Sequence, residues 1–244
     1  MKLPIVQLDE VSVRFELPQE RIASFKEFAI RRMQRRVRYR ELWAVRDVSL
    51  ALREGDAVGI IGRNGAGKTT LLRLVARVIQ PTSGRVRVIG TVAPLLQLGA
   101  GFHPDLTGRE NVFLNATLLG HDHDDVVAQF PDIVEFSELA DFIDAPLRTY
   151  SSGMATRLGF AVATAWRPDI LLVDETLSVG DEAFQIKCDK RIAAYRALGT
   201  SVLLVAHQLD LVTSMCREAI WLEHGVVKLS GAAHDVTAAY HAAA

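Results

Sequence analysis

One short stretch limits the fold of this chain more than any other. Residues 62–69 read Gly-Arg-Asn-Gly-Ala-Gly-Lys-Thr, which is the phosphate-binding loop pattern G-x-x-x-x-G-K-[ST]. The apolar run Ala57–Ile61 before the loop predicts a buried strand, and residues 69–76 after it have the apolar spacing of a helix. Because a strand, a loop and a helix in this order form a cradle for phosphate, the chain is predicted to bind a nucleoside triphosphate.

The positions of this loop have separate predicted roles. Its glycines let backbone N–H groups curl around phosphate oxygens. The Lys68 ammonium reaches the β- and γ-phosphates, and the Thr69 hydroxyl is a ligand for Mg²⁺. The predicted nucleotide-binding residues of the loop are Gly62, Arg63, Asn64, Gly65, Ala66, Gly67, Lys68, Thr69 and Thr70.

Composition narrows the class of protein. The 244 residues are 49% hydrophobic, which supplies a sizeable core, and the net charge of -1 gives no general attraction to nucleic acid. Cys188 and Cys216 lie far apart without metal-ligand spacing and are interpreted as reduced thiols. The longest apolar stretches, around 158–166 and 201–206, are too short to cross a bilayer.

The order of apolar segments predicts an α/β protein in which a helical region interrupts the sheet. The runs 170–173 and 201–206 are continuously apolar, as in central parallel strands that are covered on both faces. Between about 108 and 167 the pattern is helical instead, with helices expected at 111–119, 124–136 and 154–166. We treat residues 1–244 as one domain. Strands are expected at 6–15, 44–52, 57–61, 86–89, 170–173, 201–206, 219–223 and 226–229.

Three polar side chains follow the two central strands. Asp174 and Glu175 come directly after the run 170–173, and His207 comes directly after the run 201–206. Ligands of parallel sheets bind at the carboxyl ends of the strands, so these side chains are expected beside the phosphate loop. Asp174 is predicted to hold Mg²⁺ through a water, Glu175 to activate the attacking water and His207 to hydrogen-bond the γ-phosphate.

The segment 150–154 reads Tyr-Ser-Ser-Gly-Met and precedes a predicted helix. With the phosphate loop, Asp174-Glu175 and His207 in the same order, it resembles the ATP-binding cassette family, the ATPase subunits of ABC transporters, over essentially the whole chain. The resemblance implies a P-loop NTPase cassette with a RecA-like mixed sheet core and an antiparallel β subdomain. It also implies a helical subdomain inserted at about 98–168, and ATP and Mg²⁺ as ligands.

In that family the signature Leu-Ser-Gly-Gly-Gln contacts the γ-phosphate that the other subunit binds. The resemblance therefore implies a homodimer in which Ser151, Ser152, Gly153 and Asp181 act in trans. Ser152 stands in place of the first signature glycine and Met154 in place of the glutamine, so the contacts of that glutamine do not carry over.

Further segments resemble the branch of the family that exports polysaccharides such as O-antigen, capsule and teichoic acid. They are Leu-Gly-Ala-Gly-Phe-His-Pro at 98–104, Thr-Gly-Arg-Glu-Asn at 107–111 and Ser-Val-Gly-Asp at 178–181. This implies an ATPase that drives export of a lipid-linked polysaccharide, bound to a membrane-spanning permease in two copies at the cytoplasmic face of the inner membrane. No nucleic-acid partner is expected. The alternative is a soluble ABC ATPase acting in translation or on DNA, and a non-catalytic regulatory cassette is a third reading.

Two further positions follow from the resemblance. Gln97 occupies the position of the Q-loop, where its side chain would sense Mg²⁺ and relay to the permease. An aromatic residue near the first strands is expected to stack on adenine. Phe15 is the first choice and Trp43 the alternative, and either could equally be a core or interface aromatic.

Residues of about 16–43 form a basic insertion with amphipathic, near-helical spacing of its apolar side chains. A basic amphipathic helix lies against anionic headgroups or a membrane partner, or packs on its own domain as a solvated helix. Since the chain ends at residue 244, about where a cassette ends, we expect no C-terminal carbohydrate-binding domain.

Overall fold

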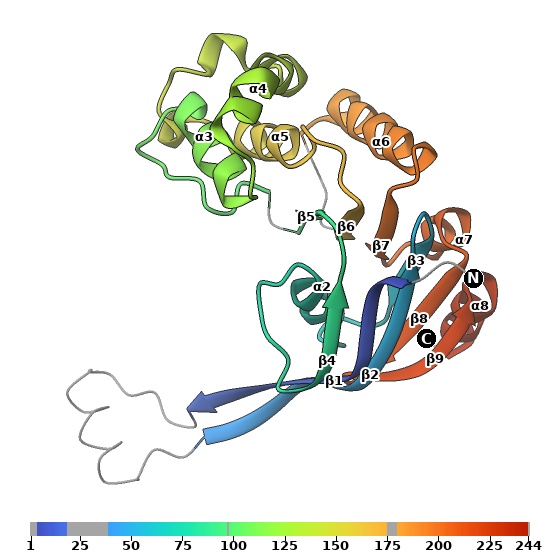
Figure 1. Ribbon diagram of the computed structural model, residues 1–244. Coiled ribbons are helices and arrows are strands. Elements are labelled where there is room, and N and C mark those ends of the chain that lie inside the picture. Colours follow the sequence, from blue (N-terminus) through green and yellow to red (C-terminus); the bar gives the residue numbers. More distant parts are fainter. Residues whose placement is uncertain (1–3, 19–38, 97, 175–179, 244) are drawn as a thin grey trace, which may run out of the picture.

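The computed structural model describes residues 4–18, 39–96, 98–174 and 180–243. Its centre is a six-stranded sheet in the order β5-β6-β7-β3-β8-β9, in which β9 is antiparallel to β8 and the other pairs are parallel (Figure 1). The predicted central strands are confirmed as neighbours in the middle of this sheet. Its strands are β3 (Ala57–Ile61), β5 (Val92–Leu95), β6 (Ile170–Asp174), β7 (Ser201–Val205), β8 (Glu218–Glu223) and β9 (Val226–Ala232).

Both faces of this sheet are buried because successive side chains of a strand point to opposite faces. In β6, Leu171 and Val173 pack into a core that contains Phe160 and Phe184. Ile170 and Leu172 pack on the other face, in a core that includes side chains of α2. The continuous apolar runs in the sequence therefore reflect burial on two sides.

A second, three-stranded antiparallel sheet has the order β2-β1-β4. Its strands are β1 (Pro4–Pro18), β2 (Tyr39–Arg53) and β4 (Ser83–Val88). The helix α2 (Lys68–Val75) packs between this sheet and the central one, where Leu71, Leu72 and Val75 are completely buried. This packing fixes the start of α2, where the phosphate loop ends.

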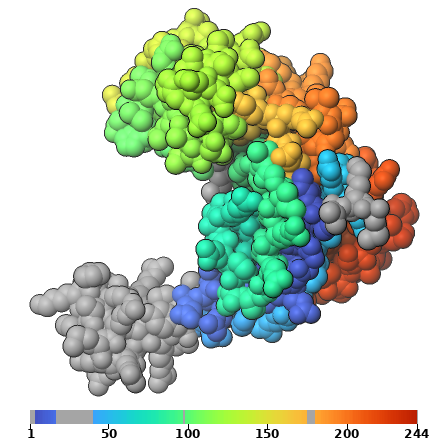
Figure 2. All heavy atoms as spheres, in the orientation of Figure 1, coloured from blue at the N-terminus to red at the C-terminus, as the bar shows by residue number. Residues whose placement is uncertain are grey.

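A helical lobe is inserted between β5 and β6, and it forms one end of the molecule (Figure 2). A capping box begins its first helix, since Thr107 and Glu110 each accept a backbone N–H of the other. The lobe consists of α3 (Gly108–Leu118), α4 (His123–Ser137), the short 3-10 helices η1 (Ala140–Phe142) and η2 (Leu147–Thr149), and α5 (Ser152–Ala163). The predicted fold class, an α/β cassette with an inserted helical region and an antiparallel sheet, is confirmed.

Sequence patterns missed β5 and three helices: α6 (Glu182–Ala197), α7 (Leu209–Met215) and α8 (Ala233–Ala243). The strand β5 is four residues long and contains Pro94, so it gives little strand signal. The helix α6 covers the sheet mainly through Phe184, Cys188 and Ile192 and is otherwise rich in charged residues. Weak apolar periodicity explains why α6 was not predicted.

The helical conformation predicted for the insertion at about 16–43 is wrong at both ends. β1 continues through Pro18 and β2 begins at Tyr39, and the two strands pair over Glu16↔Glu41 and Pro18↔Tyr39. Strand pairing satisfies the backbone groups of both segments, and the apolar residues with helical spacing lie between them, at 22–37. The middle of the predicted insertion, 19–38, lies outside the described residues.

Among the helices of the described ranges, none combines the length and the apolar character that a membrane crossing needs.

Candidate nucleotide-binding site

The phosphate loop connects the end of β3 to the start of α2, as the sequence predicts. Gly67 stands at the N-cap of α2 with φ 104, a left-handed conformation that favours glycine. A Cβ there would lie 2.5 Å from the Ala44 carbonyl oxygen and 2.7 Å from a Val45 methyl group. This glycine is therefore required by the close approach of β2 as well as by its backbone conformation.

The Lys68 side chain folds over the loop and is 7% exposed. Its ammonium donates to the carbonyl oxygens of Gly62, at 2.6 Å, and Arg63, at 3.2 Å. The loop thus positions a buried cation beside the N-terminus of α2, whose backbone N–H groups favour an anion. A bound phosphate would compete with the two carbonyl groups for this ammonium.

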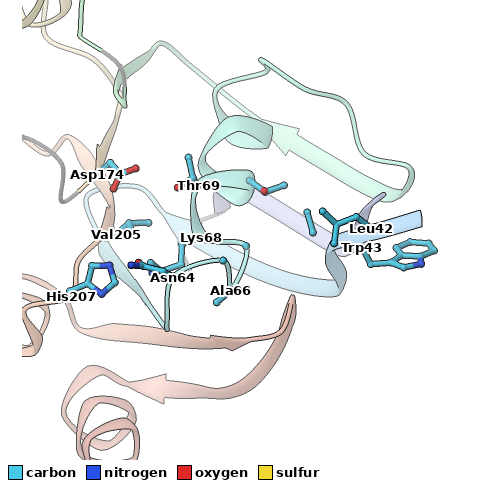
Figure 3. A pocket seen from close by; sticks show the side chains of 13 residues that line it. Leu42, Trp43, Asn64, Ala66, Lys68, Thr69, Asp174, Val205 and His207 are labelled. Atoms are coloured by element: carbon cyan, nitrogen blue, oxygen red, sulfur yellow. The ribbon is translucent and has the colours of Figure 1, made fainter. Parts of the chain in front are cut away.

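A pocket of about 320 Å³ opens over the loop (Figure 3). Figure 3 shows Asp174 and His207 at one end, Leu42 and Trp43 at the other, and Lys68 between them. Asp174 ends β6 opposite Val205 of β7, and His207 follows two residues later, so neighbouring strands bring both side chains to this edge. The lining consists of Leu42, Trp43, Ala44, Asn64, Gly65, Ala66, Gly67, Lys68, Thr69, Thr70, Asp174, Val205 and His207.

The oxygen donors of the pocket fit a hard cation. The Thr69 hydroxyl and the Asp174 carboxylate both line it, and Asp174 is 8% exposed. Mg²⁺ prefers such oxygen ligands together with waters and the phosphates of a substrate. Two of the predicted Mg²⁺ ligands are therefore brought together. The third, Gln97, and the predicted water-activating residue Glu175 lie outside the described residues.

The two aromatic candidates lie on opposite faces of the paired strands β1 and β2. Phe15 pairs in register with the pocket-lining Leu42, so both point to one face, and Phe15 is 39% exposed. Trp43 also lines the pocket, but the guanidinium carbons of Arg14 and Arg46 lie 5.6 and 4.8 Å from its ring centroid. Phe15 is not among the residues that line the pocket. Leu42 and Ala44 do line it, and sequence patterns did not single them out.

The signature residues Ser151–Gly153 stand at the start of α5 and do not line this pocket. The Ser151 hydroxyl caps α5 by accepting the Met154 N–H at 3.2 Å. A Cβ on Gly153 would meet nothing in its own chain closer than the Ser151 Oγ at 3.8 Å. Among the described residues, nothing therefore crowds this glycine, although glycine costs about 1 kcal/mol in a helix relative to alanine.

Asp181, predicted to act in trans, is bonded within its own chain. One carboxylate oxygen caps α6 by accepting the Phe184 N–H at 2.9 Å, and the other accepts the Arg157 Nη2–H at 2.6 Å. The backbone hydrogen bond from Phe184, aided by the Arg157 charge, lowers the pKa of this carboxyl. Arg157 was missed in the sequence because nothing but its place one turn after the signature distinguishes it.

Known proteins resemble this chain in sequence and in fold. Residues 45–178 match the ABC transporter family. RfbB, an O-antigen export system ATP-binding protein of Klebsiella pneumoniae, is 44% identical over 97% of both chains. TagH, a teichoic acids export ATP-binding protein of Listeria monocytogenes, is 37% identical over 96% of this chain and 69% of its own.

Solved structures show the same fold. A dimeric ATP-binding cassette bound to ADP and Pi in a post-hydrolysis state superposes with a TM-score of 0.71 at 21% identity, over 93% of this chain and 98% of that one. The phosphate loop, the acidic strand end and the helical lobe of this chain have the same order along the sequence that the family resemblance requires. The chain therefore belongs to the ABC transporter family, as an ATPase cassette of the branch that contains the O-antigen and teichoic acid export proteins.

Proposed function

We propose that this chain is the ATP-hydrolysing subunit of an exporter that moves a lipid-linked, O-antigen-like polysaccharide across the cytoplasmic membrane. The support is the similarity to an O-antigen export protein along 97% of both chains. Two copies of the chain would bind a membrane-spanning permease, also in two copies, at the cytoplasmic face. The alternative of a soluble cassette acting in translation or on DNA finds no support among these relatives.

The observation that carries the ATPase assembly is the separation of the signature from the phosphate pocket. Ser151–Gly153 lie on the helical lobe, whereas the lining of the pocket comes from the loop, β2, β6 and β7 with the residues that follow them (Figure 1). The open space at Gly153 and the positive end of α5 suit a phosphate brought by another molecule. A second copy, facing the first, would supply such a phosphate.

In this dimer, ATP lies between the loop of one copy and Ser151, Ser152 and Gly153 of the other. Lys68 and His207 stabilise the charge that develops on the γ-phosphoryl group, and Glu175 activates the attacking water. Thr69, Asp174 (through a water) and Gln97 would hold Mg²⁺, which neutralises charge on the phosphates when bound. Loss of the γ-phosphate removes contacts between the copies, and the dimer opens.

For the adenine ring we propose the face that carries Phe15 and Leu42. This face is exposed next to the pocket, whereas the ring of Trp43 already has two guanidinium groups beside it. Loss of one stacking ring costs about 1–3 kcal/mol per base. Phe15→Ala should therefore weaken ATP binding about 5- to 150-fold, measured by calorimetric titration. The matched variant Trp43→Ala should change it less, and the reverse order would assign the stacking role to Trp43.

The export function is tested in the native host. A host strain that produces only the Lys68→Ala variant should accumulate the lipid-linked polysaccharide inside the cell and lack it at the surface. The control variant Lys228→Ala removes a surface lysine that pairs with Glu223 away from the pocket, and it should export normally. Normal surface polysaccharide with the Lys68→Ala variant would contradict the proposal.

A further inference from the structure

Arg157 of α5 makes contacts with two other helices, α4 and α6. It lies four residues after Gly153 on α5, so the two residues share one face of the helix a turn apart. Its Nη2–H donates to Asp181 at the start of α6, at 2.6 Å, and its Nη1–H donates to Glu138 at the end of α4, at 2.9 Å. Its guanidinium carbon also lies 4.8 Å from the centroid of the Phe184 ring.

A lysine of α6 joins the same arrangement. We call the four residues Arg157, Glu138, Lys187 and Asp181 the ion-pair ring, which the backbone of α6 closes. The remaining carboxylate oxygen of Glu138 pairs with the Lys187 ammonium of α6 at 3.1 Å. Lys187 also donates to the Phe136 carbonyl oxygen at 2.9 Å. The start of α6 is therefore attached to the helical lobe at two points, Asp181 and Lys187.

Gly180 has no side chain, and the Arg157 side chain occupies the space that a Cβ would need. A Cβ on Gly180 would lie 2.9 Å from the Arg157 Nε and 3.4 Å from its Cγ. The residue before Asp181 is thus shaped around this arginine. The contact is part of the local structure of the connection into α6 and does not depend on the ion pair alone.

The ion-pair ring contributes more to the relative positions of α4, α5 and α6 than to the free energy of unfolding. The Arg157 side chain is 20% exposed, while those of Glu138 and Asp181 are 49% and 64% exposed. Exposed ion pairs add little to the free energy of unfolding because solvent screens them and long side chains lose freedom. A planar guanidinium that donates to two carboxylates does, however, hold them at a defined separation.

We infer that Arg157 is a positioning residue that holds Gly180 and Asp181 in a fixed place relative to the signature residues Ser151–Gly153. Both segments then reach a second copy of the chain as one rigid surface. The inference rests on the proposed function, in which the signature completes the partner's ATP site. It predicts that loss of Arg157 weakens ATP-driven pairing of two copies and leaves binding of ATP to the phosphate loop of one copy unchanged.

The test uses the full chain with Glu175→Gln to prevent hydrolysis. Arg157→Ala removes the guanidinium, and Arg157→Lys keeps the charge without the planar fork. Sedimentation in ATP gives the dissociation constant of the dimer, and a fluorescent ATP analogue gives nucleotide affinity at concentrations where the chain is monomeric. Arg109→Ala is the matched control, since Arg109 pairs with Asp144 at 2.7 Å within the helical lobe and makes no ion pair with α6.

We expect both Arg157 variants to raise the dimer dissociation constant about tenfold, as loss of one coupled polar contact does, with analogue affinity and melting temperature unchanged. Arg109→Ala should have the same dimer dissociation constant, analogue affinity and melting temperature as the parent. A dimer as tight with Arg157→Ala as with Arg109→Ala would overturn the inference and leave the proposed function intact. A parallel loss of analogue affinity would also overturn it, because that result indicates general damage to the fold.

Asp181→Asn separates the ion pair from the helix cap, because asparagine caps a helix as well as aspartate does. If Asp181 acts through Arg157, Asp181→Asn should weaken the dimer to a similar extent, and the double variant should be no weaker than either single one. Fully additive effects would show that the two residues act separately, against the inference. If the parent with Glu175→Gln does not dimerise in ATP at all, the inference and the proposed ATPase assembly fail together.

Discussion

At the residue scale, the phosphate loop itself holds the Lys68 ammonium in place. Its ammonium is buried and bonded to two carbonyl groups of the loop, so the cation is already in place where the phosphates are expected. Exchanging these carbonyl groups for phosphate oxygens replaces neutral acceptors with charged ones.

Lys68→Ala should therefore weaken ATP binding about 10- to 100-fold, the usual cost of losing a hydrogen bond to a charged group, and should abolish ATP hydrolysis. Calorimetric titration and a phosphate-release assay measure the two effects. Lys228→Ala serves as the control and should bind ATP like the unmodified chain. An unchanged affinity of the Lys68→Ala variant for ATP would show that Lys68 does not contribute to the ATP site.

The two cysteines give a pH-dependent prediction at the same scale. Burial raises the pKa of Cys188 to about 12 and that of Cys216 to about 11. A thiol whose pKa is raised in the folded state stabilises the fold fully below the unfolded pKa of 9.0, and this stability is lost as pH rises from 9 toward 12.

Between pH 8 and pH 10.5, Cys188 alone should contribute a loss of about 2 kcal/mol in the free energy of unfolding. Urea unfolding of the unmodified chain and of Cys188→Ala at both pH values measures it. The variant should lose about that much less than the unmodified chain. Equal losses in the two proteins would show that Cys188 ionises as readily in the folded state as in the unfolded state.

At the scale of elements, the two glycines of α5, Gly153 and Gly159, have different roles. Gly153 stands in its first turn where a methyl group has room, whereas at Gly159 a Cβ would lie 2.5 Å from the Gly99 backbone nitrogen. The two positions therefore require glycine for different reasons. Close packing within the chain requires the second, and the proposed phosphate of a partner copy requires the first.

Gly153→Ala should therefore raise the free energy of unfolding by up to about 1 kcal/mol, since alanine favours a helix. The same change should lower ATP hydrolysis about 100-fold, because the methyl group stands where the γ-phosphate must meet the start of α5. Gly159→Ala should instead destabilise the chain. Thermal melts and phosphate release report the two effects, and full activity with Gly153→Ala would place the phosphate elsewhere.

Elements with strong local signals were predictable, and those held by tertiary contacts were not. The loop at 62–69 and the strands β6 and β7 follow from short motifs and buried runs that no other fold explains as well. The helix α6 was not predicted because about half of its residues are polar, and two of its basic side chains, Lys187 and Arg191, lie over the Phe136 ring of α4. Pairing of β1 with β2 likewise extends both strands beyond the apolar runs predicted at 6–15 and 44–52.

The same limit applies to the site. Lys68, Thr69, Asp174 and His207 could be placed in one pocket because each ends a strand or begins a helix at one edge of the sheet. Arg157 could not, since its importance comes from two carboxylates that lie 19 and 24 residues away along the chain. Contacts of that kind appear only when the helices are packed together.

At the scale of the whole molecule, the two proposed halves of an ATP site lie in different places in the chain. The phosphate pocket lies over the central sheet, and the signature stands on the helical lobe (Figure 1). Two copies that face each other would form two complete sites, so ATP would hold the pair together and its hydrolysis would release it. This cycle is what would drive an attached permease.

The most direct test is the mass of the Glu175→Gln variant in solution, measured by light scattering during gel filtration. With ATP and Mg²⁺ we expect a species of twice the 26.9 kDa of one chain, and a single-chain mass with ADP or after the further change Gly153→Ala. A variant that binds ATP and remains at the mass of one chain would contradict the composite site.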